Sequence, residues 1–224
     1  MDTVKVDVYV CVHKGLRGLI DRFSFDAGAT DWTNPTAVAR LHTQWQIVKR
    51  LLHSHHDREE RFIHPLLARI SPGGHRPYDA DHRTQEILLA DLEAHFEGLV
   101  AGNTGEEMKA TMGLEFYRGL NLFFAEYLRH MHREETEAER VLHATCPQGE
   151  LVAVMGRLLA SIPEDEMMLW IDCMFPAMNL SECEKLLAGM KACTPPEAYE
   201  AMAERAREAR SQSNASRLEA MLVR

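Results

Sequence analysis

The chain has 224 residues, 46% hydrophobic and 26% charged, which is typical of a globular protein long enough to bury a core. Its formal net charge of −9 argues against a nucleic-acid partner, because such partners bind to basic patches. The first residues lack the basic segment and apolar run of a signal peptide, and no apolar stretch reaches membrane-spanning length. We therefore expect a cytoplasmic protein without a membrane partner.

Histidine is unusually frequent, with 12 residues, whereas the cysteines follow no recognisable pattern. The five cysteines are odd in number, scattered and without a CxxC pair, so they indicate reduced thiols rather than disulfides or a zinc site. One histidine on an apolar face is more often a core residue than a ligand. The placement of the histidines must therefore decide their role.

Capping signals divide the first two thirds of the chain into four long predicted helices. Asn34 is a suitable N-cap, with Pro35 in the first helical position. Asp79 is a plausible cap for the third helix, and Thr104 with Glu107 forms a capping-box pattern before the fourth. The helices are expected at about 5–24, 34–70, 79–102 and 104–143.

The last third contains signals for shorter helices. Ser161 with Glu164, and Ser181 with Glu184, fit capping boxes. The expected ranges are about 147–161, 163–174, 182–191 and 196–221. Since no segment has the alternation of a strand, we expect an all-α fold. An antiparallel four-helix bundle over 1–145 would precede a helical extension over 146–224, which packs on the bundle or lies at an oligomer interface such as that of a homodimer.

The second and fourth long helices each carry a histidine and a glutamate on an otherwise apolar seam. Segments 55–60 and 130–135 both read H-x-x-R-E-E. A histidine and a glutamate four residues apart lie one turn apart on the same side, from which both can reach a metal. At steps of three, four or seven residues, the one seam contains Trp45, Val48, Leu52, His55, Glu59, Phe62 and Leu66, and the other contains Phe123, Tyr127, His130, Glu134 and Val141.

The other two long helices add histidines to their own apolar stripes. His13 lies on the first, and His82 lies on the third with Glu86 one turn later. Buried carboxylates call for compensating charge, so four inward histidines accompanied by glutamates favour a metal site. Imidazole and carboxylate ligands without thiolate suit iron or manganese, and six or seven ligands are about right for two bridged irons.

At these residues the chain resembles the hemerythrin-like, or HHE cation-binding, family. The matching segments are 12–17, 55–65, 81–82 and 130–135, in family order. The resemblance implies an antiparallel four-helix bundle with an oxo- or hydroxo-bridged di-iron centre. Carried over residue by residue, it implies the ligands His13, His55, Glu59, His82, His130 and Glu134.

One position departs from the oxygen-carrying members of that family. They have a second histidine one turn after the first on the third helix, whereas this chain has Glu86. Glu86 is therefore a candidate seventh ligand, and if it does not bind, one iron has an open position. We expect the remaining histidines beside these stripes to be neighbours rather than ligands: His53, His56, His64 and His132.

The leading functional hypothesis is a di-iron protein that binds O2 or a related small oxidant, peroxide or nitric oxide. One alternative is an enzyme that turns over peroxide, with Tyr127 or Glu86 as general acid, and a steady-state peroxide assay would distinguish it. Another is an iron sensor, in which metal occupancy controls the folding of the bundle and thereby a partner-binding surface.

Overall fold

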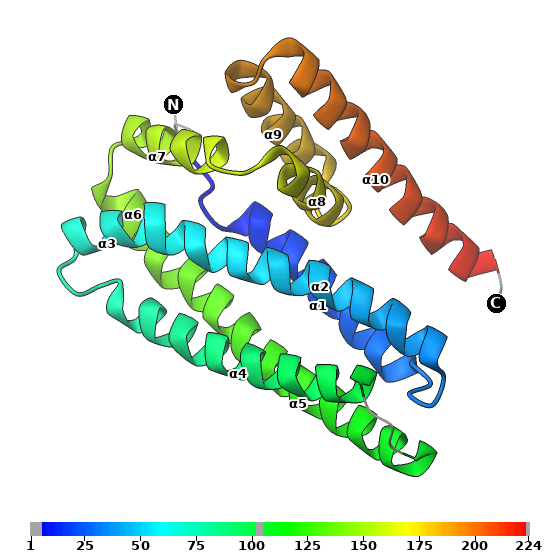
Figure 1. The fold of residues 1–224 in the computed structure, drawn as a ribbon. Helices are drawn as coiled ribbons and strands as arrows, with labels where there is room; N and C mark the ends of the chain where they lie inside the picture. Colours follow the sequence, from blue (N-terminus) through cyan, green and yellow to red (C-terminus); the bar gives the residue numbers. More distant parts are fainter. Residues whose placement is uncertain (1–5, 102–104, 223–224) are drawn as a thin grey trace. The chain divides into compact units, whose positions relative to one another are not determined.

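The computed structural model describes residues 6–101 and 105–222, and it confirms the all-α expectation (Figure 1). Over these ranges the ordered backbone is helical and contains no strand. None of the helices in the described ranges combines the length and apolar character needed to cross a membrane. The chain divides into two compact units, one formed by Leu19–Gln148 and the other by Met1–Gly18 with Gly149–Arg224. The sequence-based division at 145/146 remains a prediction.

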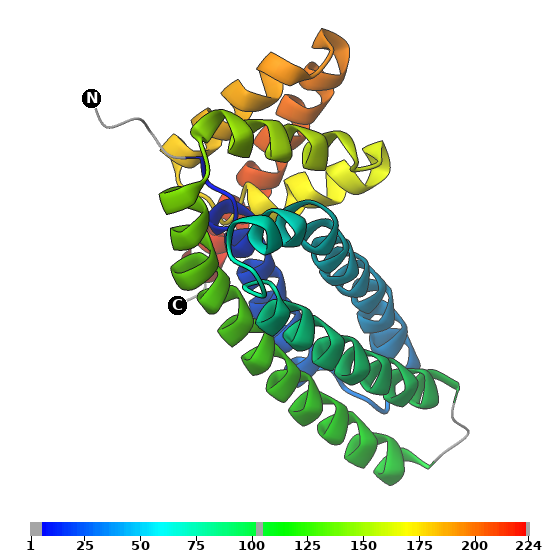
Figure 2. The ribbon, with the colours of Figure 1, turned by 90° about the vertical axis from the view of Figure 1, so that its left-hand side faces the viewer.

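The unit Leu19–Gln148 contains the long helices expected in the first two thirds of the chain. Helices α2 and α4 contact each other, as do α4 and α5, and they run side by side in both views (Figures 1 and 2). Its elements are the later part of α1 (Val10–Ala29), α2 (Pro35–Arg58), η1 (Glu59–Ile63), α3 (His64–Ile70), α4 (Arg76–Ala101), α5 (Glu106–Arg133), η2 (Glu134–Ala138) and α6 (Glu139–Thr145).

Aromatic side chains from these helices form the core of this unit. The ring of Phe23 on α1 stacks on Trp45 of α2 with centroids 5.3 Å apart, and Trp45 meets Phe116 of α5 edge-on at 5.8 Å. Phe96 of α4 lies 4.6 Å from Phe116. Large rings in such offset and edge-on contacts bury much apolar area, so this end of the unit is a packed apolar core.

A glycine permits the closest approach within this core. Trp32, in the connection between α1 and α2, packs against Gly113 of α5, where an added Cβ atom would lie 2.1 Å from the indole. Trp32 also contacts Phe96 and Phe116 edge-on, at 5.8 and 5.6 Å. A side chain at Gly113 would therefore have to displace a ring that two other rings hold in place.

The other unit contains the C-terminal helices α7 (Gln148–Ala160), α8 (Glu164–Met174), α9 (Leu180–Cys193) and α10 (Pro196–Leu222). Their apolar core centres on Ile171, Phe175 and Met190. Arg210 of α10 donates to the carbonyl oxygen of Met178 at 2.8 Å, and Arg205 pairs with Asp172 of α8 at 2.5 Å. These polar contacts fix the last helix on its neighbour.

The predicted N-cap of α2 is confirmed, whereas that of α9 is wrong. The carboxamide of Asn34 accepts from the backbone N–H groups of Thr36 and Ala37, as predicted. The predicted capping box at Ser181 is wrong, because Asn179 and Glu182 form it instead. Helix α5 begins after Gly105 without a side-chain cap, and Thr104 lies outside the described residues.

The cysteine expectation is also confirmed where side chains are described. The free cysteines are Cys11, Cys146, Cys173 and Cys183, of which all but Cys11 are buried. Burial, together with the neighbouring Asp7 carboxylate, raises the pKa of Cys11 to about 12. Its thiolate, the reactive form, is therefore rare at neutral pH.

Candidate metal centre

Both His–Glu pairs stand where an α-helix widens into one π turn. The segment η1 begins at Glu59 and η2 begins at Glu134. In each, the backbone N–H five residues later donates to the carbonyl oxygen of the glutamate, from His64 in the first and from Glu139 in the second. Single π turns inside α-helices occur often at functional sites.

The extra residue in each turn shifts the buried face by one position. Ile63 is buried where the sequence pattern predicted Phe62, which is only half-buried. Likewise Leu142 is buried where Val141 was predicted. The predicted seams are therefore correct up to the glutamates and wrong by one residue immediately after them. Pro65 favours the wide turn in η1, because it lacks the N–H group that would extend the α-helical pattern.

Glu59 faces two histidines from different helices. Its Oε1 atom lies 3.3 Å from Nε2 of His55 on α2, and its Oε2 atom lies 3.3 Å from Nε2 of His82 on α4. All three side chains are buried. A buried carboxylate that meets two imidazole nitrogens in this way could hold a cation together with them.

The second His–Glu pair meets the same histidine from α5. Nε2 of His130 lies 3.2 Å from Oε2 of Glu134, and 3.0 Å from Nε2 of His82. His130 and Glu134 are buried. The structure thus brings together five of the seven predicted ligands: His55, Glu59, His82, His130 and Glu134.

Outer carboxylates determine which nitrogen of each ring carries the proton. Nδ1 of His82 lies 3.0 Å from Glu60, and Nδ1 of His130 lies 3.3 Å from Asp81, which also pairs with Arg133 at 2.7 Å. A carboxylate is an acceptor, so in the neutral imidazole Nδ1 carries the hydrogen and Nε2 keeps its lone pair. The lone pairs of both rings consequently point at each other and at Glu59 and Glu134.

A buried cluster that contains only acceptors needs protons or cations. Burial and the nearby carboxylate of Glu59 raise the pKa of Glu134 well above its ordinary value. Burial lowers the pKa of His82, but the carboxylates of Glu59 and Glu60 outweigh it, so the net shift is upward. Burial dominates at His130 and lowers its pKa. The metal-free site therefore holds protons where cations would otherwise neutralise the acceptors.

Two histidines that we expected to be neighbours join the buried donors. Ligand atoms of Glu59, His64, His82 and Glu134 all lie within 4.8 Å of one another. Those of His56, His82 and His130 do so as well, and the His56 ring stacks on His82 with centroids 4.0 Å apart. His53 and His132 are exposed. The signal for His64 was the five-residue spacing from Glu59, which the α-helical period of the sequence pattern hides.

The remaining predicted ligands are His13 and Glu86. His13 is a buried residue of α1 in the unit Met1–Gly18 with Gly149–Arg224, where its ring packs 5.4 Å from that of Tyr9. Glu86 is exposed, because the buried face of α4 passes through His82, Gln85 and Leu89. Both remain predictions from the sequence.

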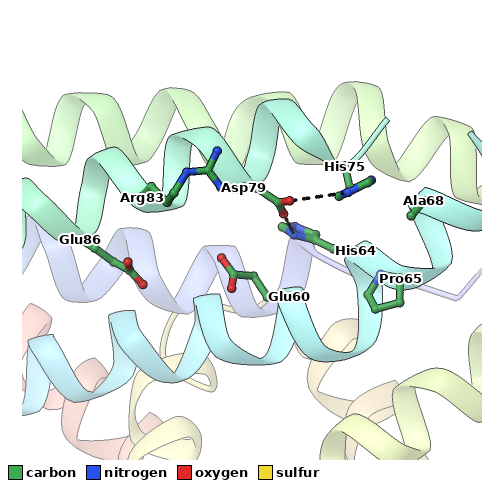
Figure 3. A pocket seen from close by; sticks show the side chains of 8 residues that line it. All are labelled: Glu60, His64, Pro65, Ala68, His75, Asp79, Arg83 and Glu86. Carbon is green, nitrogen blue, oxygen red and sulfur yellow. Dashed lines mark hydrogen bonds and ion pairs between the residues drawn. The ribbon is translucent and has the colours of Figure 1, made fainter. Parts of the chain in front are cut away.

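A pocket of about 420 Å³ lies beside the centre, between η1, α3 and α4 (Figure 3). Glu60 and Glu86 point toward one another across it, and Asp79 lies between His64 and His75. Polar residues that line it are Glu60, His64, His75, Asp79, Arg83 and Glu86. The pocket is therefore an acidic hollow that reaches the outer side of His64.

Comparison with known proteins assigns the chain by one match. The family described as hemerythrin HHE cation binding domain matches residues 5–142, which include every candidate ligand. No curated protein and no solved structure matches the chain.

Proposed function

The chain belongs to the family of hemerythrin HHE cation-binding domains, and from this premise we propose that it holds two iron ions and binds O2, peroxide or nitric oxide at them. The observation that carries the proposal is the contact between Nε2 of His82 and Nε2 of His130, 3.0 Å apart, with both Nδ1 atoms on carboxylates. Two lone pairs that face each other at this distance repel unless a cation or a proton lies between them.

The donor set supports iron over zinc. The buried donor groups within the described ranges consist of imidazoles and carboxylates, without thiolates. Structural zinc prefers four ligands, commonly including cysteine, whereas imidazole with carboxylate suits iron. The number of donors, and the two oxygens of Glu59 on two different histidines, support a pair of ions rather than one. His13 stays a proposed ligand on the strength of the sequence pattern alone.

The residues of the chain have separable roles in this proposal. Glu59 and Glu134 would neutralise the charge of the metal ions. The imidazoles of His55, His82 and His130 would hold these ions in position. A pair of irons supplies redox chemistry with small oxidants, provided that one coordination position stays open. Glu60 and Asp81 hold the rings in position and increase their basicity, as outer carboxylates do for metal-bound histidines.

The experiment is anaerobic mixing of the reduced, iron-loaded chain with O2, peroxide or nitric oxide, followed by near-ultraviolet and visible absorption. At least one of the three should produce a new absorption band with an amplitude proportional to bound iron. Glu59→Gln protein, treated identically, should give little or none. If none of the three small molecules changes the spectrum of the iron-loaded wild-type chain, the proposal that it binds O2, peroxide or nitric oxide is refuted.

A further inference from the structure

We propose that His64 is a metal ligand, on the side of the centre that carries His82. This inference rests on the proposed function and goes beyond the ligands that the sequence pattern assigns. His64 is buried, with a relative exposure of 3%. Its ligand atom lies within 4.8 Å of those of Glu59, His82 and Glu134.

The π turn explains why His64 faces the same way as Glu59. In an α-helix a residue five positions later lies well off the face of the first residue. In η1 the backbone N–H of His64 donates to the carbonyl oxygen of Glu59, so one wide turn separates the two residues. The bulge therefore turns both side chains toward His82.

His64 has the same outer contact as the predicted histidine ligands. Its Nδ1 atom lies 2.6 Å from Oδ1 of Asp79, just as Nδ1 of His82 meets Glu60 and Nδ1 of His130 meets Asp81. Such a carboxylate keeps the hydrogen on Nδ1 and leaves the Nε2 lone pair for a metal. Because all three rings have a carboxylate on Nδ1, we expect them to share the role of metal ligand.

The inner nitrogen of His64 supports the assignment independently. Nε2 is buried and has no hydrogen-bond partner within the described residues. An unpaired buried acceptor destabilises the fold, so a histidine is rarely left in this state without a reason. A cation held by Glu59, His82 and Glu134 would provide the missing partner.

The geometry favours His64 over the two competing residues. Glu86, which the sequence suggested, is exposed on the far side of the pocket. His56 also has a buried Nε2 atom without a partner, but its ring is stacked on His82 and on Tyr127, at 4.0 and 5.2 Å. His64, by contrast, has the outer carboxylate of Asp79 on its Nδ1 atom.

The test compares His64→Ala with His75→Ala in the full chain. His75 lies in the same pocket, 3.7 Å from Asp79, but is outside the donor group, so its removal controls for changes in the pocket. Iron content by elemental analysis, the rate of iron removal by a chelator, and the absorption spectrum of the loaded protein are measured. We expect His64→Ala to lose one iron, or to release half of its iron at least about tenfold faster with a shifted spectrum, while His75→Ala matches wild type.

Exogenous imidazole should slow the release from His64→Ala, because the pocket gives access to the missing ring, and a purely structural role would show no such rescue. If His64→Ala does not fold, His64→Gln, which is closer in size, replaces it. Wild-type iron content, release rate and spectrum in the folded variant would overturn the assignment, as would iron loss in His56→Ala alone. A wild-type chain that binds fewer than two irons would instead refute the proposed function.

Discussion

His82 and His130 come from different helices and meet through their Nε2 atoms, 3.0 Å apart, while a carboxylate contacts the opposite nitrogen of each ring. Packing alone would not favour this contact, because it buries two lone pairs beside two carboxylates. The metal-free protein must keep protons in the cluster, and each metal ion that enters must displace some of them. Metal binding, protonation and folding stability are therefore linked.

Iron should raise the stability of the fold. Binding to the native state alone stabilises by mass action, by about 4 kcal/mol when free metal exceeds the dissociation constant about a thousandfold. Chelator-stripped and iron-reconstituted protein would be compared by thermal melts at neutral pH. The stripped protein should melt distinctly lower, and reconstituted Glu134→Gln should recover little of the difference. Equal melting temperatures at full iron content would mean that the metal lies outside the buried cluster.

The gap between these two melting temperatures should widen as the pH rises. The pKa of Glu134 is raised in the folded, metal-free chain, so its contribution to stability is full below the ordinary value of 4.5 and is lost as the pH rises through the raised value. Iron binds the deprotonated carboxylate, so the stability of the iron-bound form relative to the metal-free form increases over the same pH interval.

The lowered pKa values of His56 and His130 have the opposite effect on stability. Below the ordinary value of 6.5, they make the fold more stable as the pH rises. The contribution of Glu134 is therefore isolated by subtracting the same pH series for Glu134→Gln. If the wild-type gap minus the Glu134→Gln gap stays constant across pH, or narrows as the pH rises, the raised pKa of Glu134 is contradicted.

Removal of an outer carboxylate should weaken iron binding without abolishing it. Asp81→Asn leaves Nδ1 of His130 without its anionic partner, and such changes typically cost about 10–100-fold in metal affinity. Asp57→Asn, on the exposed side of α2, is the matched control. Iron affinities are measured by competition with a calibrated chelator. Equal affinities for the two variants would show that Asp81 does not support iron binding.

The sequence predicted the all-α fold correctly, and it paired each of two histidines with the glutamate that lies beside it, because both features depend on periodicity. A histidine and a glutamate four residues apart on an apolar seam stay on one face of any α-helix, so His55 with Glu59 and His130 with Glu134 could be read directly. Glu86 lies outside the buried face of α4, because the helix buries Gln85, three residues after His82, rather than the fourth residue.

The contribution of His64 could not be derived from an α-helical period, because a π turn changes the period locally. Pro65 was the one local hint, and η2 contains the same turn without a proline. The outer carboxylates Asp79 and Asp81 come from α4, so their contacts with His64 and His130 depend on tertiary packing.

The apolar end of the same unit offers a test that is independent of metal. Gly113→Ala should destabilise the chain by about 1–3 kcal/mol, because the new methyl group would overlap the indole of Trp32. Gly98→Ala in α4 is the control, since its Cβ atom would meet nothing closer than Met112 at 3.9 Å. That change should be neutral or stabilising by up to about 1 kcal/mol. Urea unfolding of both variants without metal measures the difference, and equal stabilities would contradict the tight contact.

The most direct test of the central claim is the metal content of the chain after iron-replete expression, measured with its absorption spectrum. We predict about two irons per chain with the near-ultraviolet absorption of a ferric pair, and loss of at least one iron in Glu59→Ala but not in Asp57→Ala, whose carboxylate is exposed. One zinc and no iron in the wild-type chain, or full iron content in Glu59→Ala, would contradict it.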